Sequence, residues 1–248
     1  MDIIYTIWLR SVKRYLRSKS RIIGSLGMPL FFLVIVGFGL NSSLTFQGGF
    51  NYVGYVIPGI ISMSVLFTSM FSGIQIIWDK QFGFLKETLV APVSRIEIML
   101  GQTLGGATTS LVQGLIILFF SLFIGHDLPT LSGFLIALLF MVIIGLSFTA
   151  FGIAIASRME DMHGFQLIMN FIIFPIFGLS GALFPLTNLP NWLRVMTHID
   201  PLTYGVEGVR YGLLGISQIN LAMSFIVLTS FAVVMVIIGA ALFNRIEI

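Results

Sequence analysis

The chain has 248 residues, of which 57% are hydrophobic and only 9% are charged. A soluble globular domain is typically about 25% charged, so this chain has too few charges to cover a water-exposed surface. Cysteine is absent, which excludes disulfides and thiolate metal sites. Six of the 13 basic residues lie within the first 21 positions. We expect this basic segment to meet anionic lipid headgroups and not nucleic acid, because no soluble domain accompanies it.

Residues 1–20 predict an amphipathic helix that lies in the cytoplasmic interface. Apolar residues recur there at helical spacing, and basic residues occupy much of the remaining circumference. Trp8 is expected to anchor this helix at the level of the headgroups. Two roles stay open, namely lipid anchoring alone or the additional docking of a cytoplasmic partner. The basic region is too long for a cleavable signal peptide, and no small-residue cleavage site follows the apolar run.

Intervals without Asp, Glu, Lys or Arg predict the membrane spans. A transmembrane helix needs about 20 apolar residues, because a rise of about 1.5 Å per residue must cover about 30 Å of hydrocarbon. The longest uncharged interval, residues 22–78, is interrupted by turn-forming residues between Asn41 and Asn51 and therefore reads as two helices. We predict an all-α integral membrane fold with six transmembrane helices, at residues 22–40, 57–77, 104–125, 133–156, 165–184 and 220–243.

The basic residues outside these spans predict the orientation of the chain. With six spans, the two termini share one side with the loops at residues 78–103 and 157–164. That side carries eleven Lys and Arg residues, and the other side carries only Arg194 and Arg210. Because cytoplasmic loops are enriched in basic residues, both termini are expected in the cytoplasm. A five-span arrangement would place Arg245 outside and leave a long uncharged segment unexplained, so we reject it.

Small residues recur within the predicted spans and indicate close helix packing. Packing within the chain is the first interpretation, and an oligomer interface is the second. The residues concerned are Gly101, Gly105, Gly145, Gly152, Ala156, Gly178 and Ala182.

The loop at residues 78–103 is the longest predicted cytoplasmic connection, and it mixes charged with apolar side chains. Phe82, Leu85 and Leu89 lie at positions i, i+3 and i+7, which suits a short helix that Pro92 ends. Exposed apolar side chains on a short charged helix indicate a protein contact. The alternative is an interfacial helix that rests on lipid.

The segment at residues 185–219, on the opposite side, predicts two short amphipathic helices at the outer interface. Asn188 is expected to cap the first of them. Asp200 and Pro201 form a good N-cap and first-turn pair for the second. Glu207 and Arg210 lie three positions apart and are expected to neutralise each other, which matters if this segment is re-entrant.

Several kinds of chemistry are missing from the sequence. No G-x-x-x-x-G-K-[ST] segment occurs, so the chain has no P-loop for ATP. His126, His163 and His198 lie in different loops, and we predict neither a metal site nor a catalytic residue. No charged residue falls within a predicted span, which disfavours a carrier driven by an ion gradient. The polar residues of the spans are expected to bond neighbouring helices and not a substrate, namely Gln75, Gln113, Gln166, Asn170 and Ser180.

Two separated segments resemble ABC-2 type transporter permeases. The first, DKQFGFLKETLVAPVSR from Asp79 to Arg95, resembles the cytoplasmic loop of that family. The second begins with LSGALFPL at Leu179 and continues through Asp200-Pro201 to Arg210, and it resembles the signature region. Length, span number and the N-terminal helix also match, so the resemblance covers nearly the whole chain as one domain, residues 1–248. The daunorubicin-resistance and nodulation-factor exporter permeases are the members that it resembles most.

The resemblance implies a homodimer of permeases, each paired with a separate ATP-binding cassette subunit. ATP and Mg would bind that partner, so this chain itself would hold no cofactor. The cytoplasmic loop would form a coupling helix that inserts into the ATPase beside the N-terminal helix, Asp2–Lys19. The coupling residues implied for this sequence are Phe82, Phe84, Leu85, Lys86, Glu87, Leu89, Pro92 and Arg95.

The resemblance also implies a substrate path along the dimer interface. Its lining would come mainly from the second and fifth spans, which carry Gln75, Asn170 and Phe174. Re-entrant helices within residues 186–215 would close the outer end of this path. The gate residues of that end would be Pro185, Asp200, Pro201, Tyr204, Glu207 and Arg210.

The sequence thus favours a permease subunit of an ATP-driven exporter in the plasma or inner membrane. Its substrate would be amphipathic, lipid-linked, glycan-like or drug-like, and outward transport follows from the resemblance alone. A stand-alone channel or facilitator is one alternative, although it would need a continuous polar pore. A membrane scaffold that docks a cytoplasmic partner other than an ATPase is another.

Overall fold

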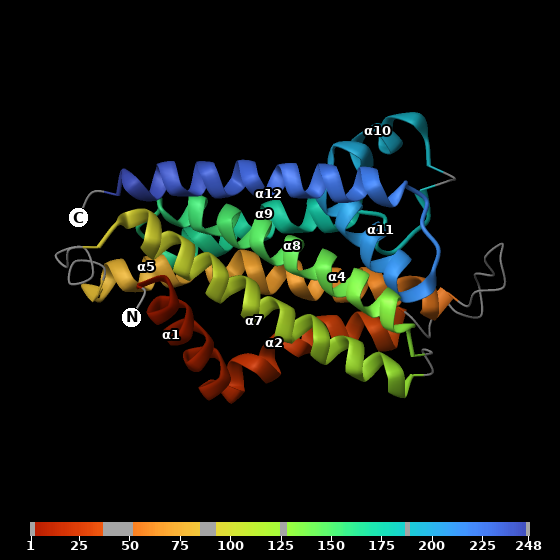
Figure 1. Ribbon diagram of the computed structural model, residues 1–248, viewed down its shortest axis with the longest axis horizontal. Coiled ribbons are helices and arrows are strands. Elements are labelled where there is room, and N and C mark those ends of the chain that lie inside the picture. The colour runs from red at the N-terminus through yellow and green to blue at the C-terminus, as the bar shows by residue number, and fades with distance from the viewer. Residues whose placement is uncertain (1–2, 37–51, 85–92, 125–127, 187–188, 247–248) are drawn as a thin grey trace.

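A computed structural model describes residues 3–36, 52–84, 93–124, 128–186 and 189–246, and every long regular element in these ranges is a helix (Figure 1). The elements in chain order are α1 (Ile3–Arg17), α2 (Lys19–Phe31), η1 (Phe32–Val36), α4 (Tyr52–Ser72), α5 (Ile74–Gln81), α7 (Arg95–Phe123), α8 (Leu131–Ala156), α9 (Met162–Leu179), α10 (Asn191–Ile199), α11 (Pro201–Leu214) and α12 (Leu221–Asn244).

Five helices in these ranges are long and apolar enough to cross a membrane. They are the continuous α4–α5 helix, α7, α8, α9 and α12. A sixth span results if α1 and the Ile22–Ile35 helix, which are bent by 71° relative to each other, count as one broken crossing. The prediction of an all-helical, multi-pass membrane protein is therefore confirmed. The end of the first predicted span, residues 37–40, lies outside the described residues.

The helices run lengthwise in one bundle with two distinct ends (Figure 1). The start of α1, the whole of α5 and the end of α12 lie at one end, which we call the α5 end. Helix α11 lies at the opposite end, which we call the α11 end, and α10 projects from the bundle there. The start of α1 and the end of α12 therefore lie at the same end of the bundle, in keeping with the six-span count.

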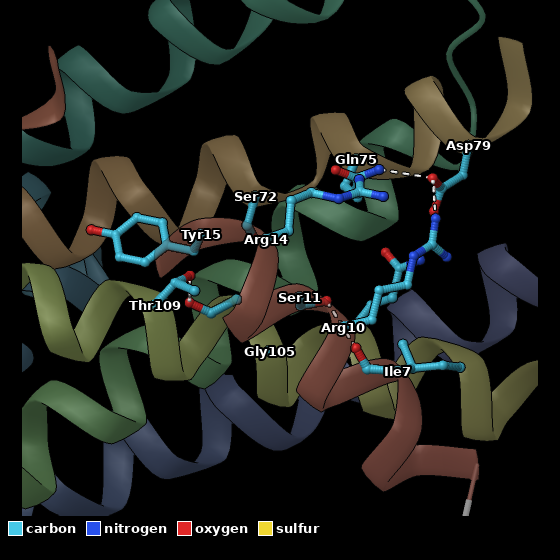
Figure 2. Close-up of a pocket in the computed structure, with 12 residues that line it drawn as sticks. Ile7, Arg10, Ser11, Arg14, Tyr15, Ser72, Gln75, Asp79, Gly105 and Thr109 are labelled. Atoms are coloured by element: carbon cyan, nitrogen blue, oxygen red, sulfur yellow. Dashed lines mark hydrogen bonds and ion pairs between the residues drawn. The ribbon is translucent and has the colours of Figure 1, made fainter. Parts of the chain in front are cut away.

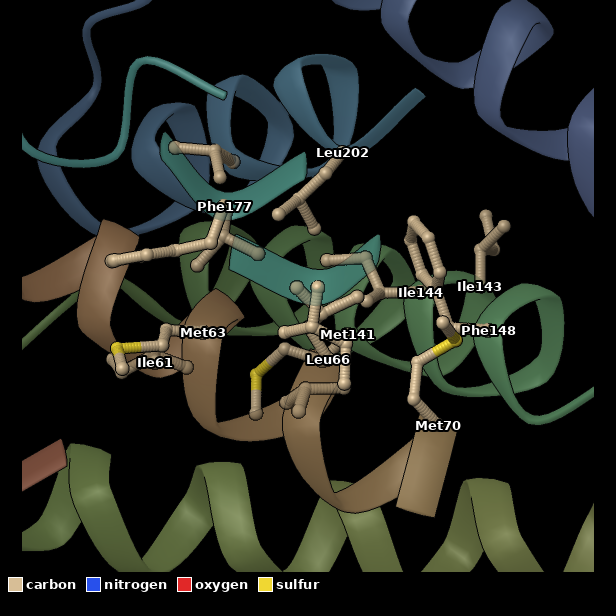
Figure 3. Packing of buried hydrophobic residues seen from close by; sticks show 14 of the residues in the cluster. Ile61, Met63, Leu66, Met70, Met141, Ile143, Ile144, Phe148, Phe177 and Leu202 are labelled. Atoms are coloured by element: carbon tan, nitrogen blue, oxygen red, sulfur yellow. The ribbon is translucent and has the colours of Figure 1, made fainter. Parts of the chain in front are cut away.

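Helix α4 occupies the centre of the bundle, in contact with α7, α8, α9 and α11. Figure 3 shows the cluster of buried apolar side chains that surrounds it. Because lipid tails are as apolar as these side chains, van der Waals packing and not water exclusion stabilises such contacts. The cluster includes Ile61, Met63, Leu66 and Met70 of α4, Met141, Ile144 and Phe148 of α8, Phe177 of α9 and Leu202 of α11.

Glycines let α8 approach its neighbours at backbone distance. A Cβ at Gly152 would overlap the carbonyl of Met70 on α4, and a Cβ at Gly133 would overlap the carbonyl of Gly212 on α11. At these two positions, packing within the chain explains the small residue. Gly178 differs, because a Cβ there meets nothing within 4 Å among the described atoms. That glycine lies on an exposed face of α9.

Local capping decides where several helices begin. Ser94 and Glu97 form a capping box at the start of α7, nine residues before the predicted start of that span. Asp200 accepts a hydrogen bond from the Leu202 amide, with Pro201 in the first turn of α11, as predicted. The predicted cap Asn188 lies outside the described residues, and α10 begins at Asn191 with Pro190 at the N-cap position.

Candidate functional site

At the α5 end, α1 packs against α7 (Figure 2). Gly105 of α7 permits this approach, since a Cβ there would lie 2.5 Å from the Ser11 Cβ. The Trp8 indole donates a hydrogen bond to the Thr108 hydroxyl at 2.9 Å. The expected interfacial anchor Trp8 is therefore half-buried against a neighbouring helix. Sequence periodicity identified the apolar face of α1 but did not distinguish lipid from α7 as its partner.

A second contact between these helices is buried. The Tyr15 hydroxyl donates to the Gln113 Oε1 atom at 2.6 Å, and both side chains are enclosed. This bond bears out the expectation that Gln113 bonds a neighbouring helix. It fixes the end of α1 near the middle of α7.

The last turns of α5 carry a buried carboxylate that receives two hydrogen bonds (Figure 2). Asp79 is 4% exposed, and its Oδ1 atom accepts from Gln75 Nε2 at 2.8 Å and from Arg10 Nη2 at 3.3 Å. The Arg10 guanidinium also lies 5.5 Å from the centroid of the Phe84 ring. Asp79 thereby joins α1 to the last turn of α5, which ends at Gln81.

The same turn of α5 is also bound to the turn between α8 and α9. The Lys80 ammonium donates to the Ser157 carbonyl at 3.0 Å, and the Gln81 amide donates to the Glu160 carbonyl at 2.9 Å. The end of α5 is consequently held from two sides, by α1 and by the α8–α9 turn.

The structure describes three of the predicted coupling residues. Phe82 and Phe84 follow α5 and are 62% and 50% exposed, and Phe82 lies 5.4 Å from Trp78 between ring centroids. Arg95 instead donates to the Asn244 and Ile246 carbonyls at 2.7 and 3.0 Å, so it joins the start of α7 to the end of α12. The remaining predicted coupling residues lie outside the described residues, namely Leu85, Lys86, Glu87, Leu89 and Pro92.

The three predicted path residues do not form one cluster. Gln75 belongs to the Asp79 network, whereas Asn170 and Phe174 lie on α9. The Phe174 ring contacts the Phe67 ring of α4 edge-on, at 5.9 Å between centroids. Asn170 is half-buried, and its side chain has no hydrogen-bond partner in the described part of the chain. A stripe at four-residue spacing on α9 contains Gln166, Asn170, Phe174 and Gly178.

At the α11 end, Glu207 and Arg210 form an ion pair inside the protein. Both side chains are fully buried. The Arg210 guanidinium also donates to the Gly181 carbonyl at 2.8 Å and lies 4.1 Å from the centroid of the Tyr55 ring on α4. The predicted neutralisation of these two charges is confirmed. Burial without such a partner would be costly for either charge.

The ion pair belongs to a wider set of contacts that closes the α11 end. Glu207 accepts a second hydrogen bond from the backbone amide of Gln218, whose side chain accepts from the Leu186 amide at 2.7 Å. The Tyr52 hydroxyl donates to the Leu183 carbonyl at 3.0 Å. Helix α4, the 181–186 segment and α11 are therefore tied together. Sequence reasoning missed Tyr55 and Gln218, because nothing local marks residues that meet from distant parts of the chain.

The other predicted gate residues organise the junction of α10 with α11. Asp200 caps α11, and burial raises the pKa of its carboxyl to about 8. The Tyr204 hydroxyl donates to the His198 carbonyl at 2.8 Å, which fixes α10 against α11. Pro201 occupies the first turn of α11, and Pro185 lies in the segment that follows α9.

Comparison with known proteins gives a consistent result over most of the chain. The family model described as ABC-2 type transporter matches residues 3–214. The inner membrane transport permease YadH of Escherichia coli K12 is 28% identical over 244 residues, which cover 97% of this chain and 94% of YadH. The putative transport permease ycf38 of Cyanophora paradoxa is 29% identical, over 81% of this chain and 71% of ycf38. Nodulation protein J of Rhizobium meliloti is 24% identical, over 96% of this chain and 92% of nodulation protein J.

Proposed function

The chain belongs to the ABC-2 type transporter family and is a multi-pass membrane transport permease, and on that premise we propose that it is the permease subunit of an ATP-driven exporter. ATP and Mg would bind a separate ATP-binding cassette subunit. The sequence contains no P-loop of its own, in keeping with this division of labour.

The last turn of α5 is the observation that carries the proposal. Asp79 joins it to α1, and Lys80 joins it to the α8–α9 turn. Phe82 and Phe84 extend from it as exposed aromatic side chains, which indicate a protein contact. An ATPase that displaced the segment after α5 would therefore move three elements of the bundle together.

The exposed stripe on α9 supports a second copy of the chain as the permease partner. Asn170 there is half-buried without a hydrogen-bond partner in the described residues, and Gly178 leaves room for a neighbouring backbone. Polar amides and small residues are the groups that join helices in lipid. We propose that two copies meet along α9 and that the substrate passes between them, along Asn170 and Phe174.

The contacts around Glu207 and Arg210 support a closed outer end. They hold α11 to α4 and to the 181–186 segment, so opening would require these contacts to rearrange together. The bias of basic residues supports a cytoplasmic location for the α5 end and for both termini. Anionic headgroups of that leaflet would contact the basic side chains of α1. The substrate class proposed is amphipathic, lipid-linked, glycan-like or drug-like, in keeping with a largely apolar interior.

The test is purification of the chain from its native membrane in a mild detergent, followed by mass spectrometry of what co-purifies. We expect a near-stoichiometric chain with a Walker A motif. Replacing Phe82 and Phe84 by Ala should abolish the co-purification of this Walker A chain. The control truncates Phe119 and Phe123, which lie near the end of α7 and are also at least half exposed.

Two other results would change the conclusion. Recovery of the chain alone, under conditions that preserve a known complex, would favour a stand-alone channel or facilitator. Recovery with a protein other than an ATPase would favour a membrane scaffold. Equal loss of the ATPase in both double variants would show that the exposed rings at the end of α5 are not a specific docking site.

A further inference from the structure

Three neighbouring hollows lie between the basic elbow, where α1 meets α2, and an apolar groove between α2 and α4. At the elbow, Arg14, Arg17 and Lys19 line an open hollow that also includes Ser18. Arg14 and Ser18 line a second hollow as well, which reaches Phe71 of α4. Phe71 in turn lines the groove between α2 and α4. The three hollows are therefore adjacent, because each shares lining residues with the next.

The charge of the elbow is strongly positive and is not neutralised within the described chain. Arg10 pairs with Asp79, whereas Lys13, Arg14, Arg17 and Lys19 have no acidic side chain within ion-pair distance among the described residues. Among the described residues that line these hollows, Asp79 is the only acidic one, and Arg10 already offsets it. An anionic group fits this concave basic surface, because guanidinium and ammonium groups both bind phosphate.

The groove between α2 and α4 is mainly apolar. Its volume is about 340 Å³, within the roughly 300–1,000 Å³ of typical ligand sites. Met28, Met63, Phe67 and Phe71 dominate its lining, and methionine side chains adapt readily to a flexible apolar chain. Gly24 leaves one wall of the groove open, since a Cβ there meets nothing within 4 Å among the described atoms.

We propose that these spaces form a binding site for one anionic phospholipid, with its phosphate on Arg14, Arg17 and Lys19 and an acyl chain between α2 and α4. The basic end lies at the bend between α1 and the Ile22–Ile35 helix. Basic amphipathic helices bind at the depth of lipid headgroups, so an anionic headgroup would reach this bend. The apolar end lies between α2 and α4. The charged headgroup of a lipid would therefore contact the basic elbow, and its acyl chain would contact the apolar groove.

The site also touches the network at the end of α5. Arg14 lines the polar cavity that contains Gln75 and Asp79, and Figure 2 shows its side chain extending towards them. A bound phosphate would hold Arg14 beside the turn that precedes residues 85–92. The leaflet that supplies the lipid follows from the proposed orientation, whereas binding itself does not depend on any ATPase partner.

The test uses the purified full-length chain in detergent, supplemented with equal amounts of phosphatidylglycerol and phosphatidylcholine, with retained lipids counted by native mass spectrometry. We expect one phosphatidylglycerol per chain and no retained phosphatidylcholine. Replacing Arg14 and Arg17 by Gln should weaken retention about 25-fold, or about fivefold for each basic residue removed. The charge-matched control replaces the exposed Arg158 and Arg245 by Gln and should retain the lipid.

The tail is tested by filling the groove. Gly24→Phe places a ring where a Cβ meets no atom, so the chain should fold and lose the lipid. Gly27→Phe is the matched control, because Gly27 is equally open but does not line the groove. Circular dichroism and gel filtration would verify the fold of each variant.

Equal retention of both phospholipids, or undiminished retention after loss of Arg14 and Arg17, would overturn the proposal. Lipid loss in the arginine variant but not in Gly24→Phe would overturn the groove as the acyl site, because the lipid would then bind only to a basic surface. Equal lipid loss in both glycine variants would overturn it in the same way.

Discussion

The Arg210 guanidinium of α11 lies over the Tyr55 ring of α4, 4.1 Å from its centroid, inside the protein. A desolvated cation on an aromatic face contributes about 2 kcal/mol. The same cation forms an ion pair with Glu207 and a hydrogen bond to Gly181. One side chain of α11 thus contacts the central helix, the segment after α9 and Glu207 at the same time.

We expect Arg210→Met to destabilise the protein strongly. The substitution leaves the Glu207 carboxylate buried without its cation, which typically costs about 3–5 kcal/mol. The measurement is the thermal unfolding midpoint in detergent. Arg158→Met removes an exposed arginine and serves as the control, with little expected change.

The double variant Glu207→Gln, Arg210→Met should be more stable than Arg210→Met alone, because no uncompensated charge remains in it. If the single and double variants melt at the same temperature, the loss comes from packing and not from the buried charge.

The bond between Tyr15 and Gln113 should stabilise the docking of α1. Tyr15→Phe removes the hydroxyl that donates to Gln113 Oε1 at 2.6 Å. The buried acceptor is then left without this donor, which should lower the free energy of unfolding by about 1–3 kcal/mol. Limited proteolysis within α1, together with thermal unfolding, measures the effect. Tyr5→Phe alters a half-exposed tyrosine on the same helix and should be neutral. Equal protease sensitivity of the two variants would argue against the bond as the anchor of α1.

Close approach of α8 to α4 should make Gly152 intolerant of a side chain. Gly152→Leu forces the helices apart, because the new Cβ would meet the Met70 backbone, and overpacking of this kind costs about 1–3 kcal/mol or more. Gly178→Leu adds the same atoms in open space and should leave the monomer fold intact. Fluorescence-detected gel filtration separates folded from aggregated chain. A folded peak for Gly152→Leu as large as that of wild type would contradict the packing described.

Asp200 should make stability depend on pH. Burial raises the pKa of its carboxyl to about 8 in the folded chain, whereas an unfolded aspartate loses its proton near pH 4. Between these values the folded state binds more protons than the unfolded state, so stability from this group falls as pH rises from about 4 to about 8. Well above pH 8, Asp200 is ionised in both states, and its contribution to stability no longer changes with pH.

Asp200→Asn keeps the capping acceptor for α11 but has no proton to lose. We expect its melting temperature to fall less between pH 5 and pH 8 than that of wild type. Parallel curves for the two proteins would show that Asp200 is ionised in the folded chain throughout this range.

The sequence by itself determined the features that depend on local chemistry and on the thickness of a bilayer. Long uncharged intervals marked an all-helical, multi-pass membrane protein, since only about 20 apolar residues in a helix can cross the hydrocarbon. The Asp200–Pro201 start of α11 and the Glu207–Arg210 pair follow from spacings of one and three residues. Two local segments also marked the family to which the chain belongs.

Only the tertiary structure decided which partners these groups meet. Tyr55 lies under Arg210, Arg10 reaches Asp79, and Trp8 faces Thr108, although each pair is separated by 69 residues or more. Apolar periodicity shows which face of a helix is buried. It does not show whether that face contacts lipid or another helix, because both are apolar. The physical reason is that association of helices in lipid depends on close backbone approach and on a few polar contacts, and these arise only when the helices are assembled.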